Sequence, residues 1–230
     1  MKNLLTIYAL LCLLTSCSTD SDFNSSGLNS TTLEESKNVQ TGPENRLNPF
    51  DKEGILYYNA FVAYQGDKQL PKSVEEMTEQ IKYISSQIEK KKNTQKRIIV
   101  FNDSIVESIM ADPDNYMINI VQSSQLTAYA KGNVINFLQG LINQRQLDFT
   151  VSYNYIVDYE GTVIDDTSLD ADERETILTI TSISRYSLYS ETERKDKDWD
   201  LSAGNKPAKK IFSQNEISVI SIIALLHNIL

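Results

Sequence analysis

Cysteine and histidine, the residue types that carry much of nucleophilic and metal chemistry, are scarce in this chain. Its 230 residues contain two Cys and one His. A Cys/His zinc site needs four ligands of these types, and a disulfide framework needs several cysteine pairs. The sequence therefore excludes both, and it predicts neither a catalytic residue nor a bound metal.

The single histidine, His227, lies in the apolar segment at 217–230. A histidine acts as a general base only when a partner orients it beside the reacting group. No sequence feature near His227 supplies that partner, so we interpret it as a packed or surface histidine.

Several carboxylates gather between residues 165 and 173, and oxygen ligands of this kind are those that Ca²⁺ prefers. The stretch lacks the alternating Asp or Asn ligands, the central Gly and the closing Glu of an EF-hand loop. We therefore predict helix capping and a solvated loop rather than a calcium site. The residues are Asp165, Asp166, Asp170, Asp172 and Glu173.

The charge balance of the chain argues against a nucleic-acid partner. There are 22 basic and 31 acidic side chains, which give a formal net charge of -9. A protein that binds a phosphate backbone needs a broad basic field. The one dense basic run, from Lys90 to Arg97, is interpreted as a solvated corner between helices, open to contact with anionic headgroups or glycans.

Residues 1–17 have the order of a lipoprotein signal. Lys2 carries the one charge there, and the segment from Leu4 to Thr15 is almost wholly apolar. This run is shorter than the ~20 residues that span a bilayer, which favours a signal peptide over a membrane helix. Leu14-Thr15-Ser16-Cys17 follows and resembles the bacterial lipobox, so we predict a signal peptide over 1–16 and lipidation at Cys17.

The lipobox implies a covalent diacylglycerol on the sulfur of Cys17 and, after cleavage, an N-acyl lipid on its amine. No other cofactor is expected. Cys12 would leave with the signal peptide, so no free thiol would remain for disulfide or nucleophilic chemistry. Each buried CH₂ of the acyl chains contributes about 0.8 kcal/mol, which makes attachment to a membrane stable.

Residues 17–48 are predicted to form the acylated cysteine and a flexible tether. The segment from Ser18 to Asn48 is polar with isolated apolar residues, too few to offset the entropy lost on ordering. Its acidic start at 18–22 resembles the surface-export signal of Bacteroidetes-type lipoproteins, although Ser and Asp are also ordinary linker composition. We expect an outer-membrane location, in the surface-facing or the periplasmic leaflet.

Residues 49–230 are predicted to form a single helical, bundle-like domain. The chain has 8 Gly and 5 Pro, about half the ordinary share, which favours long helices over many turns. Apolar residues recur at helical spacing along most of the domain. The expected helices run from Pro49 to Gly66, from Ser73 to Lys92, over 98–111, from Ser124 to Asn143, from Ser168 to Tyr189 and over 217–230, the last either buried or facing a partner.

Residues 149–159 fit two structures. Aromatic and β-branched residues alternate there, which is typical of a strand, but a helical face can also be drawn. Since no partner strand with a hairpin turn lies nearby, we predict a helix and an all-α fold, with α+β containing a strand at 149–159 as the alternative. Tyr153, Tyr155 and Tyr159 are expected in the core; if exposed, they could stack on sugars or bind a partner.

Two motifs resemble an uncharacterised group of Bacteroidetes outer-membrane lipoproteins. Asn48–Gly54 is similar to their Asn-Pro-aromatic motif that ends in Gly, and Ser182–Tyr189 to their Ser-x-x-Arg-Tyr-Ser helix. The chain departs from the group at Tyr58-Asn59, where the group has His-Asn, and at Ser190-Glu191, where it has an aromatic residue and Trp. The resemblance implies an exported, helical, lipid-anchored protein without a transferable activity. We interpret Arg185 as a structural hydrogen-bond donor rather than an anion site.

Taken together, these patterns predict a lipid-anchored cell-envelope protein that acts as a non-catalytic binding or interaction module. Its partners would be the membrane, through the lipid, and a protein or glycan at the envelope. One alternative is an enzyme or accessory protein that acts on envelope glycan or peptide, which carboxylates meeting in one cleft would favour. Another alternative is an immunity-type protein.

Overall fold

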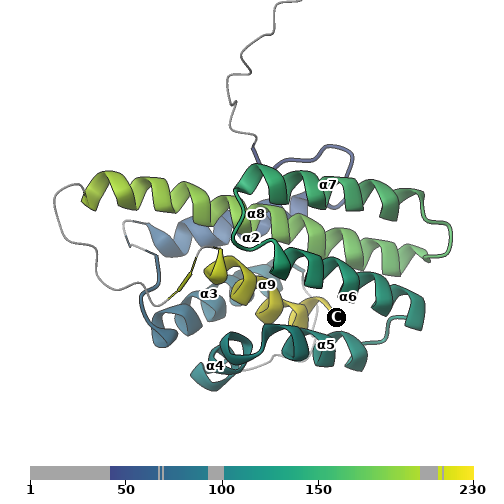
Figure 1. Cartoon of the computed structure of the whole chain (residues 1–230), viewed down its shortest axis with the longest axis horizontal. Helices are drawn as coiled ribbons and strands as arrows, with labels where there is room; N and C mark the ends of the chain where they lie inside the picture. Colours follow the sequence, from purple (N-terminus) through teal and green to yellow (C-terminus); the bar gives the residue numbers. More distant parts are fainter. Residues whose placement is uncertain (1–41, 67, 69, 93–100, 203–211, 214) are drawn as a thin grey trace, which may run out of the picture. The chain divides into compact units, whose positions relative to one another are not determined.

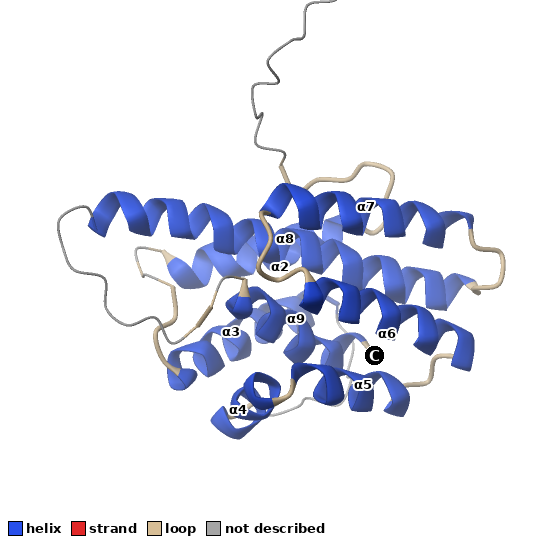
Figure 2. Cartoon of the chain, viewed as in Figure 1, coloured by secondary structure: helices blue, strands red, loops and turns tan. Residues whose placement is uncertain are grey.

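The computed structural model describes residues 42–66, 68, 70–92, 101–202, 212–213 and 215–230, with the backbone alone for 91, 92 and 196–202. Over these residues the chain forms helices joined by loops, without a strand (Figures 1 and 2). The predicted all-α class is therefore confirmed. The signal peptide, Cys17, most of the tether and most of the basic run lie outside the described residues. The helices are α2 (Asp51–Gln65), α3 (Val74–Lys92), α4 (Asp103–Ala111), α5 (Pro113–Ser123), α6 (Ala128–Asn143), α7 (Phe149–Asp165), α8 (Ala171–Ser202) and α9 (Glu216–Ile229).

Helix α8 is buried along its middle and contacts α2, α7 and α9. Buried apolar residues such as Ile177 and Leu188 share this stretch with buried serines and threonines. Small hydroxyl residues allow neighbouring helices to approach, and some of their hydroxyl groups are satisfied inside the helix. Ser184, for example, donates from its Oγ to the Ile180 carbonyl oxygen at 2.8 Å.

Helix α9 is apolar on every side and is enclosed by other helices. Every residue from Ile217 to Leu226 is buried, and the helix contacts α3, α4, α5 and α8 (Figure 1). At its start the Ser218 amide donates to the Glu191 carboxylate of α8, with 2.8 Å between N and Oε2. The helix dipole favours an anion at this end. The apolar segment predicted at 217–230 is thus a central core helix.

The ambiguous stretch at 149–159 belongs to helix α7, so the strand alternative is wrong. The buried residues of α7 are Phe149, Ser152, Ile156, Glu160 and Val163. They recur every three or four positions, which places them on one face of a helix rather than on alternate faces of a strand. Packing against α8 selects this face.

The folded unit begins before the predicted boundary at residue 49. Asn45 and Asn48 are buried, with 7% and 3% of their surfaces exposed, although they were assigned to the tether. Helix α2 starts at Asp51 rather than at Pro49, and Phe50 rather than Asn48 is its N-cap residue. The Asn48 side chain instead bonds to residues of α7 and α8.

Three other helix boundaries differ from the predictions, and local caps decide the first two. Asp112-Pro113 ends α4 and also starts a further helix, α5, whose Asn115 amide donates to the Asp112 carboxylate at 3.1 Å. The helix expected from Ser124 begins at Ala128, after the Thr127 cap. The helix expected to end at Tyr189 continues through the charged residues to 202.

Helices α2 and α8 run side by side in the same direction and approach most closely at Gly54. The Gly54 amide donates to the Ser182 Oγ at 3.0 Å. A Cβ atom at position 54 would lie 2.8 Å from the Ser182 carbonyl oxygen and would also meet the Tyr186 ring. The absence of a side chain at Gly54 therefore sets the distance between the two helices.

We predict that Gly54→Ala lowers the free energy of unfolding by about 1–3 kcal/mol, because the backbone oxygen of Ser182 cannot yield to the new methyl group. Gly161→Ala is the matched control, since Gly161 lies in α7 with open space around its Cα. That change should stabilise the helix by about 0.5–1 kcal/mol. Urea unfolding followed by circular dichroism measures both, and equal effects of the two substitutions would contradict this packing.

Candidate functional site

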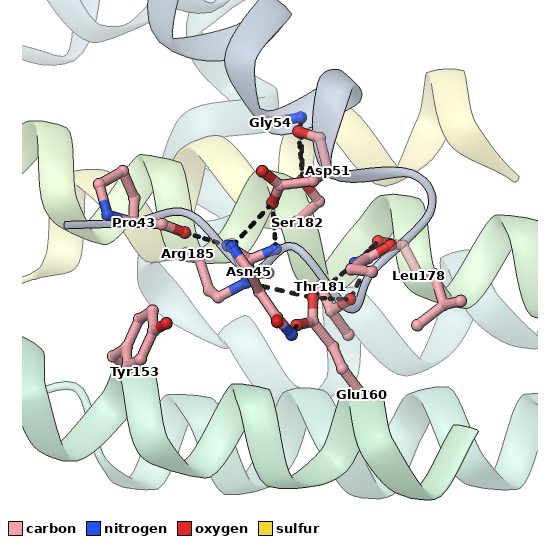
Figure 3. A network of polar contacts seen from close by, with 12 residues as sticks. Pro43, Asn45, Asp51, Gly54, Tyr153, Glu160, Leu178, Thr181, Ser182 and Arg185 are labelled. Carbon is pink, nitrogen blue, oxygen red and sulfur yellow. Dashed lines mark hydrogen bonds and ion pairs between the residues drawn. The ribbon is translucent and has the colours of Figure 1, made fainter. Parts of the chain in front are cut away.

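The Arg185 guanidinium lies at the centre of a buried polar network (Figure 3). Its side chain is fully buried, and all three of its nitrogens donate to atoms of the chain. Nε donates to Glu160 Oε1 at 3.1 Å, Nη2 donates to Asp51 Oδ1 at 2.6 Å, and Nη1 donates to the Pro43 carbonyl oxygen. The positive charge is thus matched by two carboxylates and one carbonyl.

Glu160 is the second centre of this network and is also fully buried. Its Oε1 accepts from Asn48 at 2.7 Å and from the Thr181 hydroxyl at 2.7 Å. Its Oε2 accepts from the Asn45 side-chain amide at 2.6 Å. Together with the bond from Arg185, these contacts satisfy both carboxylate oxygens without solvent.

The network joins the two motifs that carried the sequence resemblance. Asp51 bonds not only to Arg185 but also to the Tyr186 hydroxyl, with 3.1 Å between the Tyr186 oxygen and Oδ2. The Asn48 side-chain amide also donates to the Leu178 carbonyl oxygen at 3.0 Å (Figure 3). Residues of the first motif therefore contact residues of the second directly, and this contact accounts for their chemical types.

The network is suited to holding the fold rather than to contacting a ligand. Of its charged groups, Arg185 and Glu160 have no exposed side-chain surface, and Asp51 has 17%. A buried ion pair needs its remaining lone pairs and protons to be satisfied, and here they are. Arg185 thus acts within the chain as a structural donor.

The three tyrosines singled out in the sequence do not share one surface. Tyr155 and Tyr159 stack on Phe137 of α6, with ring centroids 5.8 Å and 4.6 Å from the Phe137 ring. Tyr153 lies elsewhere, and its hydroxyl donates to the Glu44 carbonyl oxygen at 2.9 Å. All three are partly buried, so α7 offers no continuous tyrosine face.

A different group of aromatic residues lies where α2 meets α8, and the sequence did not single it out. The Tyr58 ring is 6.2 Å from the Tyr186 ring and 6.1 Å from the Tyr189 ring, measured between centroids. Tyr58 and Tyr189 are partly exposed. The sequence shows that each residue lies at helical spacing within its own segment, but only the contact between α2 and α8 brings the rings together.

His227 packs against aromatic rings near the end of α9. Its Nε2 lies 3.2 Å from the Tyr116 hydroxyl oxygen, and the Phe101 ring is 6.4 Å away. Burial lowers the pKa of His227 below its ordinary value of 6.5. No carboxylate orients the ring among the contacts that the described residues make with it, which fits a packed histidine.

The acidic cluster at 165–173 is used for capping. The Asp170 Oδ1 accepts from the Glu173 amide at 2.8 Å, and the Glu173 carboxylate accepts from the Thr127 amide at 2.9 Å. Asp166 accepts from the hydroxyl of Tyr129, which is 51% exposed. Within the described residues, no group of His, Cys, Asp and Glu side chains is arranged to hold a metal ion.

Comparisons with protein-family models, with curated proteins and with solved structures find nothing that matches this chain. The described residues contain no helix with both the length and the apolar character needed to cross a membrane.

We predict that Arg185→Met lowers the free energy of unfolding by about 3–5 kcal/mol, because Glu160 would be left buried without its counter-charge. Arg185→Met combined with Glu160→Gln should recover part of the loss. Lys82→Met is the control, since Lys82 pairs with Glu79 at the surface and such pairs contribute about 0–1 kcal/mol. Urea unfolding measures all three, and a loss for Arg185→Met no larger than that of Lys82→Met would contradict the network's role.

We predict that acid destabilises the fold through His227. The unfolded chain takes up a proton near pH 6.5, whereas burial lowers the pKa of the folded His227, so stability falls as the pH drops below about 6.5. Because the chain has a single histidine, His227→Gln should flatten the dependence of unfolding free energy on pH between about 7 and 5.5. Unchanged slopes in urea titrations at several pH values would exclude this origin.

Proposed function

We propose that this protein is a lipid-anchored lipoprotein of the bacterial cell envelope that acts by binding a partner rather than by catalysis. The observation that carries the proposal is Cys17, which directly follows a charged start, a short apolar run and a small residue. That order is typical of a lipoprotein signal. The resemblance to Bacteroidetes outer-membrane lipoproteins supports the same location.

The arrangement of carboxylates supports binding over catalysis. Two carboxylates, Glu160 and Asp51, do converge on one point, but the group between them is Arg185. A general acid and base must reach a substrate bond, whereas Glu160 has no exposed surface. The pair therefore neutralises a buried cation and does not supply the acid and base that the enzyme alternative needs.

Attachment through Cys17 is consistent with how the folded unit begins. Residues 43–48 pack against α7 and α8 through Arg185 and Glu160. A lipid on Cys17 would be connected to the domain through this segment, so the domain would be joined to its anchor at a well-bonded part of the fold. A partner could then be bound near the membrane.

We predict that the full chain, produced in a bacterial host that acylates lipoproteins, incorporates an alkyne-labelled fatty acid and fractionates with membranes. Cys17→Ala should abolish the label and leave the chain with its signal peptide uncleaved. Cys12→Ala is the matched control, because Cys12 lies within the predicted signal peptide, and it should label as the wild type does.

A wild-type chain without label, or a Cys17→Ala chain that still carries it, would refute the anchor. Protease treatment of intact cells then assigns the leaflet, since a surface-facing domain is cleaved and a periplasmic one survives. Co-purification after mild solubilisation tests for a bound partner.

A further inference from the structure

The outer edge of the α2–α8 contact carries a surface that the buried network does not use. We call Tyr58, Tyr189 and Glu193 the tyrosine seam. The Tyr58 and Tyr189 rings face each other at 6.1 Å with a 45° tilt, and the Tyr58 hydroxyl donates to the Glu193 Oε2 at 2.7 Å. Both side chains are partly exposed, so part of each ring is accessible to a ligand.

Further aromatic rings extend the tyrosine seam toward α7. The Tyr189 ring lies 5.4 Å from Phe149, whose ring lies 5.8 Å from Tyr153. Tyr186 lies beneath the seam, and the Arg185 guanidinium is 5.8 Å from the centre of its ring. The chain thus already places one cation against this aromatic group from the inside.

The electrostatic field at the seam is negative. Burial raises the pKa of Tyr58 and of Tyr189, and in both cases the negative charges of Glu193 and Glu44 raise the pKa further. Glu44 is exposed. Two carboxylates therefore act on the same pair of rings, in a chain whose net charge is already -9.

The seam continues into a hollow between α2 and α8. Phe61, Val62 and Gln65 line it from α2, and Ser190, Glu193 and Arg194 line it from α8, together with Gly66. Val62 is 47% exposed, so the hollow offers an apolar wall one helical turn beyond Tyr58. Arg194 is buried and has interactions of its own.

We propose that the tyrosine seam binds the cationic side chain of an arginine or lysine carried by a protein partner. This inference rests on the proposed function and names the chemistry of its partner. The charged head would lie over the Tyr58 and Tyr189 rings beside Glu193, and the aliphatic stem would lie along Val62. Cations over tyrosine faces gain about 0.5–2 kcal/mol, more when partly desolvated.

The hydroxyl groups favour a cation over a neutral sugar. Tyr58 donates to Glu193, Tyr186 donates to Asp51, and Tyr153 donates to the Glu44 carbonyl oxygen. These three protons are already used, so the partly exposed Tyr58 hydroxyl offers a ligand an oxygen acceptor but no proton. A sugar hydroxyl needs donors as well as acceptors, whereas a guanidinium or an ammonium needs only acceptors.

The test uses the full chain in a polyoxyethylene detergent, which carries neither charge nor sugar. The probe is an acetylated and amidated peptide of alternating glycine and arginine with a neutral dye, followed by fluorescence anisotropy. The comparison peptide replaces each arginine by citrulline, which has nearly the same shape but no charge. We expect saturable binding of the arginine peptide at low ionic strength and at least tenfold weaker binding of the citrulline peptide.

Variants assign the binding to the seam. Tyr58→Ala and Tyr189→Ala should each weaken binding of the arginine peptide about fivefold or more, as expected for loss of one ring face. Glu193→Gln should weaken binding of the peptide about threefold and make this binding less dependent on salt. Tyr58→Phe should have a smaller effect than Tyr58→Ala. Tyr129→Ala and Asp166→Asn are matched controls, because this exposed tyrosine–carboxylate pair on another surface has the same chemistry.

Controls that retain wild-type affinity, with losses in the seam variants, support the proposal. It is overturned if no saturable binding occurs, if the citrulline peptide binds as well as the arginine peptide, or if the control variants lose as much affinity as the seam variants. Preferential binding of a neutral N-acetylglucosamine oligomer would also overturn it. Lipid labelling at Cys17 is an independent readout. A labelled chain that does not bind the arginine peptide refutes only the cation site at the seam, and an unlabelled chain that binds the peptide refutes only the lipid anchor.

Discussion

Arg185 stands in the middle of the buried helix α8, and its charge constrains everything packed around it. A guanidinium removed from water is costly unless anions and acceptors surround it. Glu160 fills this need from α7, Asp51 from the start of α2, and the Pro43 carbonyl from the segment before α2. Gly54 and the small hydroxyl residues of α8 then allow the close approach that these bonds require. Two helices and the segment before α2 thus all bond to a single buried cation.

The same constraint separates structural polar groups from groups that can meet a partner. The charged residues of the network are used internally, and Glu191 is used to stabilise the start of α9. What stays accessible near the α2–α8 contact is a set of tyrosine faces and carboxylates at its outer edge. In the proposed function a cation would be recognised at this edge, and an anchor at Cys17 would hold that surface near the membrane.

Helix content was predictable because periodic apolar residues and local caps act over a few neighbouring residues. The capping function of Asp170 and Glu173 could be read in this way, and the helix at 149–165 could be preferred once no partner strand was found. The N-terminal limit of the domain could not be predicted, because Asn45 is a polar residue in a polar segment. Only its contact with Glu160 in the folded chain shows that it belongs to the domain. Nor could the surface position of Tyr129 be predicted, because the spacing of residues along a helix does not say which neighbouring helix covers each of them.

By itself, the sequence determined the helical class and the apolar character of the last helix, and it predicts the lipoprotein signal at Cys17. These depend on short-range spacing and on composition, which need no partner in space. Only the tertiary structure decided that the two motifs meet, that Arg185 is balanced by Glu160 and Asp51, and that Tyr58 faces Tyr189. Those contacts join residues far apart in the chain. Their physical basis is the cost of burying charge and the room left by small residues, and both exist only once the helices pack.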